Sequence, residues 1–208
     1  QTGGRGRQQK KWVSAAGLNL TFSVRYLPRS LMPADLVSYN MAVALAVHDT
    51  VSDLLPAEQV EVKWPNDIYL NGKKVAGILI ESGLRDNRID QLVTGIGLNV
   101  NQTDFPGLPD AVSMHQVAAS PFAPEEVLET LLVALEQAYL LVESGRNRTG
   151  ILNRYNEHLY RRGELQEFLA GERTVRAYID GVDVNGHLVL RERGEKKSFT
   201  MGELVWIK

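Results

Sequence analysis

The pattern of apolar and polar residues divides the chain into segments with two different periods. Residues 18–27 alternate with a period of two, which is typical of a half-buried strand. Residues 34–55 and 124–143 carry apolar stripes with helical spacing, and each therefore predicts an amphipathic helix packed on a core. A third helix is predicted over residues 150–162, with Gly163 as its C-terminal cap.

Short strands fill the middle of the chain. Residues 60–63 and 91–100 predict single strands, and residues 68–81 predict a hairpin. An Asn-Gly pair lies at the centre of this hairpin, and these residue types readily adopt the positive φ angles of a type I′ turn. The polar residues 101–123 are expected to form an irregular connection.

Beyond residue 163 the helical spacing ends, and short apolar segments separated by glycines follow. They predict strands at residues 174–179, 187–191, 197–200 and 203–207. A tail of this kind predicts a small β-barrel. We therefore expect an α/β (α+β) protein with a larger domain over residues 1–163 and a smaller one over residues 164–208.

Composition narrows the class of protein. The chain has 208 residues, 44% of them hydrophobic and 23% charged, as in a soluble globular protein. Its net charge of -2 and pI of about 6.1 argue against nucleic acid as a partner. No apolar run approaches the roughly 18 residues of a membrane span. Cysteine is absent, which excludes a thiol nucleophile and a thiolate metal site. Together these features predict a cytoplasmic protein with no membrane partner.

The chain begins with a glycine–arginine segment, Gln1-Thr-Gly-Gly-Arg-Gly-Arg7, within a stretch that is expected to be loop up to residue 17. Glycines let backbone N–H groups approach a ligand closely, and arginines bind carboxylate or phosphate with paired hydrogen bonds. The segment therefore predicts an anion-binding loop, although an RGG-like nucleic-acid segment or a solvated tail has the same composition. Because this loop opens the chain, we expect preceding sequence to be missing.

A second candidate is the sequence Lys-Trp-Pro-Asn-Asp at residues 63–67. Lys63 ends a predicted strand, and Pro65 with the Asn-Asp pair after it favours a turn. A strand fixes the direction of a side chain, so Lys63 can present its ammonium to an anion whose charge develops during a reaction. A surface lysine on an edge strand is the alternative interpretation.

Glycines within the predicted strands at residues 75–81 and 94–101 indicate close approach of a ligand or of another backbone, or sheet packing alone. Asn99 and Asn101 share a face if the second strand continues that far, and an amide there can read a base edge. Trp12 can offer a stacking surface, although most tryptophans lie in cores. The histidines have no metal-ligand spacing, so we predict no metal held by the protein alone.

Taken in order, these segments resemble the biotin–protein ligase family. The resemblance rests on residues 1–12, 63–67, 74–81 and 95–101, and it covers nearly the whole chain. It implies a catalytic domain with a mixed sheet and flanking helices, followed by an SH3-like C-terminal β-barrel. It also implies biotin, ATP and Mg²⁺ as ligands. The biotin carboxylate attacks the α-phosphate of MgATP, and the resulting biotinyl-5′-AMP acylates a lysine of a biotin carboxyl carrier domain.

The resemblance also assigns roles to residues. Lys63 matches the lysine at the carboxylate and α-phosphate, and Arg7 matches the arginine that retains the intermediate, so both are predicted to be catalytic. Trp12 matches a residue beside the adenine, and Asn99 matches an adenine-side contact. The predicted substrate-binding residues are Gln1, Gly4, Arg5, Gly6, Arg7, Trp12, Lys63 and Asn99.

The chain departs from the family pattern at two places. The family loop continues with a further glycine and arginine, where this chain has Gln8-Gln9-Lys10-Lys11. The family also places a Ser/Thr-Thr-Asn motif and a strand–helix unit before the loop, so we expect this chain to hold only part of the biotin pocket. A non-catalytic binding module of the same fold and a lipoate-type ligase are the alternative functions, and a homodimer is left open.

Overall fold

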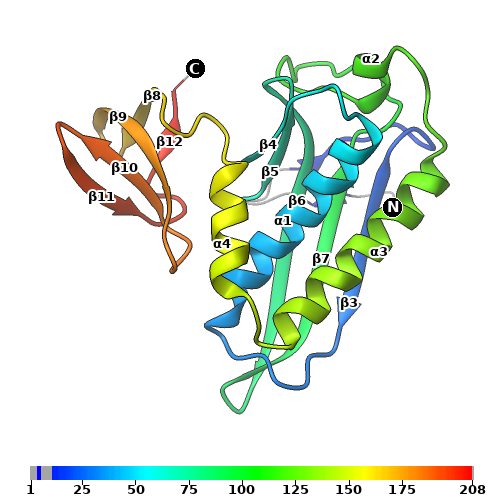
Figure 1. The fold of residues 1–208 in the computed structure, drawn as a ribbon. Coiled ribbons are helices and arrows are strands. Elements are labelled where there is room, and N and C mark those ends of the chain that lie inside the picture. The colour runs from blue at the N-terminus through cyan, green and yellow to red at the C-terminus, as the bar shows by residue number, and fades with distance from the viewer. Residues whose placement is uncertain (1–3, 6–10, 208) are drawn as a thin grey trace.

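In the computed structural model, which describes residues 4–5 and 11–207, two five-stranded sheets and four α-helices form most of the fold (Figure 1). The first sheet has the strand order β3-β7-β6-β5-β4. Its strands are β3 (Leu20–Tyr26), β4 (Val60–Lys63), β5 (Asp67–Leu70), β6 (Lys73–Arg85) and β7 (Arg88–Leu98). A two-stranded pairing of β1 (Gly4–Arg5) with β2 (Lys11–Trp12) lies within residues that we predicted to be loop.

Every strand pairing in the first sheet is antiparallel, so the predicted α/β (α+β) class is confirmed but the predicted mixed sheet is wrong for the described strands. Two tight turns explain this. Asn71-Gly72 joins β5 to β6 and Asp86-Asn87 joins β6 to β7, all four residues having positive φ. Two-residue turns of this kind can only join antiparallel neighbours.

One face of the first sheet is covered by helices. The helices are α1 (Asp35–Leu54), α2 (Met114–Ala118), α3 (Pro124–Glu143) and α4 (Arg148–Glu157). α1 packs against α3 and α4 and against β4, β5 and β6, and Figure 1 shows α1 and α3 in front of the strands, with α4 beside α1. The hydroxyls of Tyr39 and Thr94, both buried, lie 2.7 Å apart and tie α1 to β7. The opposite face of the sheet therefore remains for a ligand.

The second sheet has the order β11-β10-β9-β8-β12 and lies beside α4 (Figure 1). Its strands are β8 (Leu165–Ala170), β9 (Arg173–Val182), β10 (Leu188–Glu192), β11 (Glu195–Phe199) and β12 (Val205–Trp206). Phe168, Leu188 and Leu190 are buried in its core. No described pairing joins β11 to β12, so the strand ladder stands open at these two ends.

The segment that follows α4 ties the two sheets together. The backbone N–H of Val62 donates to the carbonyl of His158 at 2.8 Å, and the N–H of Tyr160 donates to the carbonyl of Val62 at 3.0 Å. Residues 158–160 thus pair with the outer edge of β4. The Trp64 indole N–H also donates to the carbonyl of Gly186, in the turn between β9 and β10, at 2.9 Å.

Three of the differences between the predicted elements and the structure concern α4, α2 and β8. The helix predicted over residues 150–162 ends at residue 157, and His158 rather than Gly163 is its C-cap, because the chain leaves the helix to pair with β4. The connection predicted over residues 101–123 contains α2, which begins with a reciprocal Ser113–Gln116 capping box. The strand β8 was not predicted.

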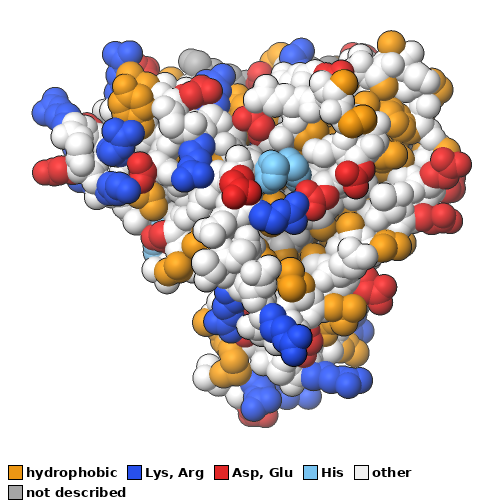
Figure 2. Space-filling view, in the orientation of Figure 1, with side chains coloured by type: hydrophobic (Ala, Val, Ile, Leu, Met, Phe, Trp, Pro, Cys, Tyr) orange, Lys and Arg blue, Asp and Glu red, His pale blue; other side chains and the backbone are white. Residues whose placement is uncertain are grey.

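The helical face carries charges of both signs. Figure 2 shows acidic and basic side chains interspersed over this face, with apolar side chains between them and acidic groups along the α3 side. No helix in the described part of the chain is long and apolar enough to cross a lipid bilayer. The helical layer thus offers no continuous basic surface in this view.

Candidate active site

Lys63 lies at the end of β4 on the sheet face that the helices leave free. Val60 and Val62 are buried, and Lys63 points to the other face because neighbouring residues of a strand alternate. The Lys63 ammonium donates a hydrogen bond to the Tyr69 hydroxyl at 2.9 Å. The position predicted from the sequence, a lysine held at a strand end, is therefore confirmed.

Three aromatic rings surround the Lys63 ammonium. Its nitrogen lies 4.6 Å from the ring centre of Tyr69, 5.4 Å from that of Tyr160 and 4.6 Å from that of Trp206. Tyr69 belongs to β5, Tyr160 to the segment after α4, and Trp206 to β12. Two parts of the chain far apart in sequence thus meet at this lysine.

Burial among these rings lowers the pKa of Lys63 to about 8. Nearby charges add smaller effects of both signs. The carboxylates of Asp67 and Asp110 raise this pKa, and the cations Arg161 and Lys74 lower it. Lys63 is therefore still mostly an ammonium at neutral pH, but it loses its proton far more easily than a solvated lysine.

The turn after Lys63 is held by β6. Residues 64–66 form the turn, and the Trp64–Pro65 peptide bond is cis. The Asn66 side-chain amide donates to the carbonyl of Ile78 at 2.6 Å, and the Ile78 N–H donates to the carbonyl of Asn66 at 2.9 Å. Asp67 then forms an ion pair with Lys74 at 2.6 Å. The turn predicted from Pro65 and the Asn-Asp pair is confirmed.

Trp12 lies flat against two glycines in the middle of the first sheet. Gly77 and Gly97 are register partners in β6 and β7. A Cβ atom added to Gly97 would lie 2.3 Å from the Trp12 ring, and one added to Gly77 would lie 3.0 Å from it. Lys74 places its ammonium 5.7 Å from the same ring. The group that approaches these strand glycines closely is thus a side chain, the indole of Trp12, and not the ligand or second backbone that we expected.

Asn99 is buried just beyond the end of β7. Its side-chain N–H donates to the carbonyl of Val112 at 3.0 Å, whereas its side-chain oxygen is buried without a hydrogen-bond partner. The expectation that Asn99 and Asn101 share a strand face fails, because β7 ends at Leu98. The Asn101 side chain instead exchanges two hydrogen bonds with the backbone of Phe122. Asn99 therefore keeps an open acceptor, and Asn101 has a structural role.

The predicted loop residues are only partly described. Gly4 and Arg5 form β1, in which Gly4 pairs with Trp12 and Arg5 pairs with Lys11. This pairing places the backbone of Gly4 and Arg5 beside that of Trp12 and Lys11. Gln1, Gly6 and Arg7 lie outside the described residues, so their predicted roles stay predictions.

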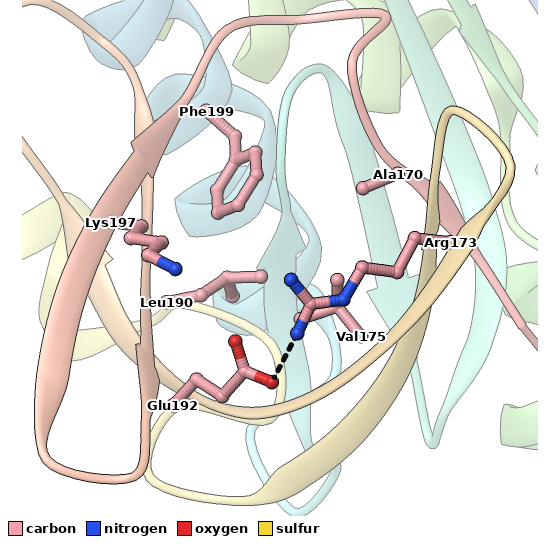
Figure 3. A pocket seen from close by; sticks show the side chains of 7 residues that line it. All are labelled: Ala170, Arg173, Val175, Leu190, Glu192, Lys197 and Phe199. Carbon is pink, nitrogen blue, oxygen red and sulfur yellow. Dashed lines mark hydrogen bonds and ion pairs between the residues drawn. The ribbon is translucent and has the colours of Figure 1, made fainter.

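A hollow in the second sheet is separate from this site. Figure 3 shows the seven side chains around it, with an ion pair between Arg173 and Glu192. The hollow is lined by Ala170, Arg173, Val175, Leu190, Glu192, Lys197 and Phe199. Its volume of about 150 Å³ is below the roughly 300 Å³ at which ligand pockets of ordinary size begin. It is therefore too small for a nucleotide.

Known proteins are similar to this chain in sequence and in fold. The Biotin/lipoate A/B protein ligase family matches residues 1–99. The biotin--[acetyl-CoA-carboxylase] ligase of Paracoccus denitrificans is 31% identical over 204 residues, which cover 92% of this chain and 81% of that protein. This chain belongs to the biotin–protein ligase family.

Two further members of the family bear on length and fold. The bifunctional ligase/repressor BirA of Bacillus subtilis (strain 168) is 35% identical over 143 residues, and the chain spans 43% of its length. The solved biotin protein ligase of Aquifex aeolicus, in complex with biotin and ATP, matches with a TM-score of 0.79 and 26% identity. This match covers 97% of the present chain and 83% of the Aquifex chain. Both sheets of this family member therefore have counterparts in a solved fold.

Three residues of the candidate site were not predicted from the sequence: Tyr69, Tyr160 and Trp206. Tyr69 could have been found, because it lies three residues after the turn that follows Lys63, in the first arm of the predicted hairpin, and a short turn favours pairing of this arm with the strand of Lys63. Tyr160 was assigned to a helix that ends before it. Trp206 reaches Lys63 only through the packing of the second sheet, for which the sequence carries no local signal.

Proposed function

We propose that this protein is an ATP-dependent biotin–protein ligase. The observation that carries the proposal is the partly buried Lys63 ammonium, fixed at a strand end on the same sheet face as Trp12. Family membership supports it, as does the Aquifex relative that was solved with biotin and ATP. The proposed catalytic residues are Lys63 and Arg7.

In the first step, a carboxylate oxygen of biotin forms a bond to the α-phosphorus of ATP. The bond from this phosphorus to the bridging oxygen breaks, and pyrophosphate leaves with the negative charge. Both reactants are anions, so their approach needs a cation at the point of contact. Lys63 supplies it, because a group with a pKa of about 8 is protonated at neutral pH.

The nucleotide is assigned to the face between Trp12 and Asn99. An indole ring offers a stacking surface, and the unpartnered side-chain oxygen of Asn99 can accept a hydrogen bond from an adenine amino group. Mg²⁺ would arrive with the ATP and would neutralise charge at the phosphates. Among the described residues no cluster of three or more acidic or histidine side chains could hold the ion, and Asp67 is already ion-paired with Lys74, so its ligands would come mainly from the phosphates.

In the second step, a lysine amine of a biotin carboxyl carrier domain attacks the acyl carbon of biotinyl-5′-AMP. An amide bond forms, AMP leaves and the amine releases a proton. Because the intermediate is a mixed anhydride, a loop that excludes water protects it. We assign this role to the segment with Gln1, Gly4, Arg5, Gly6 and Arg7 on the strength of the family resemblance.

We further propose that residues 1–163 form the catalytic domain and residues 164–208 an SH3-like second domain. The compact second sheet supports this division, and its five short strands are of the size that small barrels use. The proposed compartment is the cytoplasm, which the absence of cysteine favours.

The test is formation of the intermediate. Purified protein is incubated with biotin and MgATP, and biotinyl-5′-AMP is measured by mass spectrometry together with the pyrophosphate released. Lys63→Ala should slow adenylate formation by about 10²- to 10³-fold, the usual loss when one charge-stabilising contact is removed. Lys73→Ala, which removes an exposed lysine on β6 of the same sheet, is the matched control and should keep the wild-type rate.

Two results would contradict the proposal. Wild-type protein that forms no adenylate with biotin, but forms one with lipoate, would make it a lipoate-type ligase. Adenylate formation by Lys63→Ala at the wild-type rate would remove Lys63 from the mechanism.

A further inference from the structure

The C-terminal sheet contributes a ring to the surroundings of the reacting lysine. We propose that Trp206, together with Tyr160, is a positioning residue for Lys63: the two rings hold the ammonium at the substrate face and shield it from water. This inference rests on the proposed function, because it concerns the same lysine.

Both rings are rigidly placed. Trp206 pairs with Phe168 across β12 and β8, and the two rings lie 4.9 Å apart. Phe168 is fully buried, so it gives Trp206 a fixed support. The Ile207 N–H then donates to the carbonyl of Glu167 at 3.0 Å, which extends the pairing past Trp206. Trp206 is therefore held by the second sheet and not by the sheet that carries Lys63.

Tyr160 is held from the other side. Its backbone N–H donates to the carbonyl of Val62, the residue before Lys63. Its ring lies 4.8 Å from the ring of Tyr69 and 5.9 Å from that of Trp206. The three rings therefore support one another around the ammonium, and each has its own anchor in the fold.

An aromatic surround suits a lysine that must receive an anion. Ring faces attract a cation, but they bring no negative charge that would neutralise it before the substrate arrives. The nearest strand partner with a carboxylate, Asp67, forms its ion pair with Lys74 instead. The charge of Lys63 is thus stabilised and yet remains available to the biotin carboxylate and the α-phosphate.

This arrangement makes the ionisation of Lys63 depend on Trp206. The charged groups that act on the ammonium are Asp67 on β5, Asp110, Arg161 after α4 and Lys74 on β6. They act in opposite directions, and burial is the largest influence. Removing the Trp206 ring takes away an attraction for the ammonium, which by itself lowers the pKa of Lys63, but it also admits water, which raises this pKa. Because burial is the largest influence, the pKa should rise from about 8 toward its ordinary value of 10.5.

The experiment uses the full chain and two readouts. Competitive acetylation of Lys63 across a pH series, followed by mass spectrometry, gives the pKa of its amine without any need for activity. The pH dependence of kcat/KM for adenylate formation gives the same ionisation in the working enzyme. Wild type should lose activity above about pH 8, because the reaction uses the protonated ammonium.

Trp206→Ala should move the acetylation midpoint upward by at least about one pH unit, with a matching shift of the alkaline limb of kcat/KM. Its adenylation rate at neutral pH should fall about tenfold, as expected for the loss of one partly desolvated cation–π contact. Trp206→Phe keeps a ring and should restore both values toward wild type. Val205→Ala changes an exposed neighbour on the same strand and should alter neither.

The outcomes separate this inference from the proposed function. If the wild-type protein forms no adenylate, the proposed function is wrong. The midpoint of Lys63 acetylation, compared between wild type and Trp206→Ala, would still show whether Trp206 sets the pKa of Lys63. An unchanged midpoint in a folded Trp206→Ala protein would overturn the inference even if the rate fell. If Trp206→Ala does not fold, Trp206→Leu replaces it, because leucine keeps an apolar contact with Phe168 but has no ring face. A wild-type adenylation rate at neutral pH in Trp206→Leu would refute the inference.

Discussion

Replacing Gly97 with alanine is expected to push Trp12 off the sheet and weaken ATP binding while the fold stays intact. The added Cβ would lie 2.3 Å from one carbon of the indole and 2.6 Å from the next. Carbon atoms reach contact at about 3.5 Å, so the ring would have to retreat by about 1.2 Å. No rotation of a flexible side-chain end can relieve this overlap, because the colliding atoms lie at the centre of the indole.

The ring should yield and not the sheet. Gly97 is paired on both sides, with Thr21 in β3 and Gly77 in β6, whereas Trp12 belongs to a strand of two residues. Loss of one aromatic stack on a base costs about 1–3 kcal/mol. This corresponds to a loss of about five- to 150-fold in ATP affinity. Unfolding should not become easier, since alanine in place of glycine restricts the unfolded chain and stabilises by about 0.4–1 kcal/mol where it fits.

Calorimetry with a non-hydrolysable ATP analogue measures the affinity, and thermal denaturation checks the fold. Gly77→Ala is a graded comparison, because its Cβ would lie 3.0 Å from the ring and should cost less affinity. Gly95→Ala is the matched control on the same strand, since its nearest neighbours lie at an ordinary 3.5 Å. ATP binding by Gly97→Ala that equals the wild type, or an equal loss in Gly95→Ala, would refute this account of Trp12.

The other predictions concern pH, a helix cap and the loop. Burial, and after it the neighbouring His48, lowers the pKa of His158 below its ordinary value of 6.5. The unfolded chain therefore takes up a proton at this histidine before the folded protein does, so the free energy of unfolding should be unaffected above pH 6.5 and should fall as the pH drops below it. Urea unfolding at several pH values should show this loss, and His158→Asn should reduce it. Ser113→Ala removes the side-chain cap of α2 and should cost about 1 kcal/mol in urea unfolding, whereas an unchanged midpoint would mean that the cap is dispensable. Arg7→Gly should shorten the residence of biotinyl-5′-AMP in chase kinetics more than it slows its formation; the reverse order would argue against a retaining role.

The parts of the fold that the sequence predicted well are those with a complete local signal. α1 and α3 each carry their apolar stripe within one window and are bounded by prolines or polar residues. The hairpin turn at Asn71-Gly72 needs two adjacent residues that accept positive φ, and these are visible in the sequence.

The strand β8 was missed because its pattern misleads. The large apolar residues Leu165 and Leu169 are exposed, while Phe168 is buried with the smaller Ala170 on its side of the strand. The positions of the large apolar residues in this strand therefore suggest that the exposed face is the buried one. The end of α4 was missed for a different reason. Residues 158–160 leave the helix to pair with β4, and this choice depends on a strand far away in the sequence.

The candidate site divides in the same way. Lys63, Trp12 and Asn99 are found through local motifs and lie on or beside the first sheet, where the structure brings a strand end, a ring and an open acceptor together. Tyr160 and Trp206 reach Lys63 through tertiary packing, so composition and spacing contain no sign of them.

The pairing of residues 158–160 with β4 has a consequence for self-association. It occupies one margin of the first sheet, whereas β3, at the opposite margin, has β7 as its one partner among the described strands. An unpaired strand is a template for another copy of itself. Among the described strands, the first sheet has one such free edge, so pairing of β3 with β3 of a second copy would occupy this edge in both molecules. Growth by strand addition at this sheet would therefore stop at a symmetric pair and could not continue into a fibre.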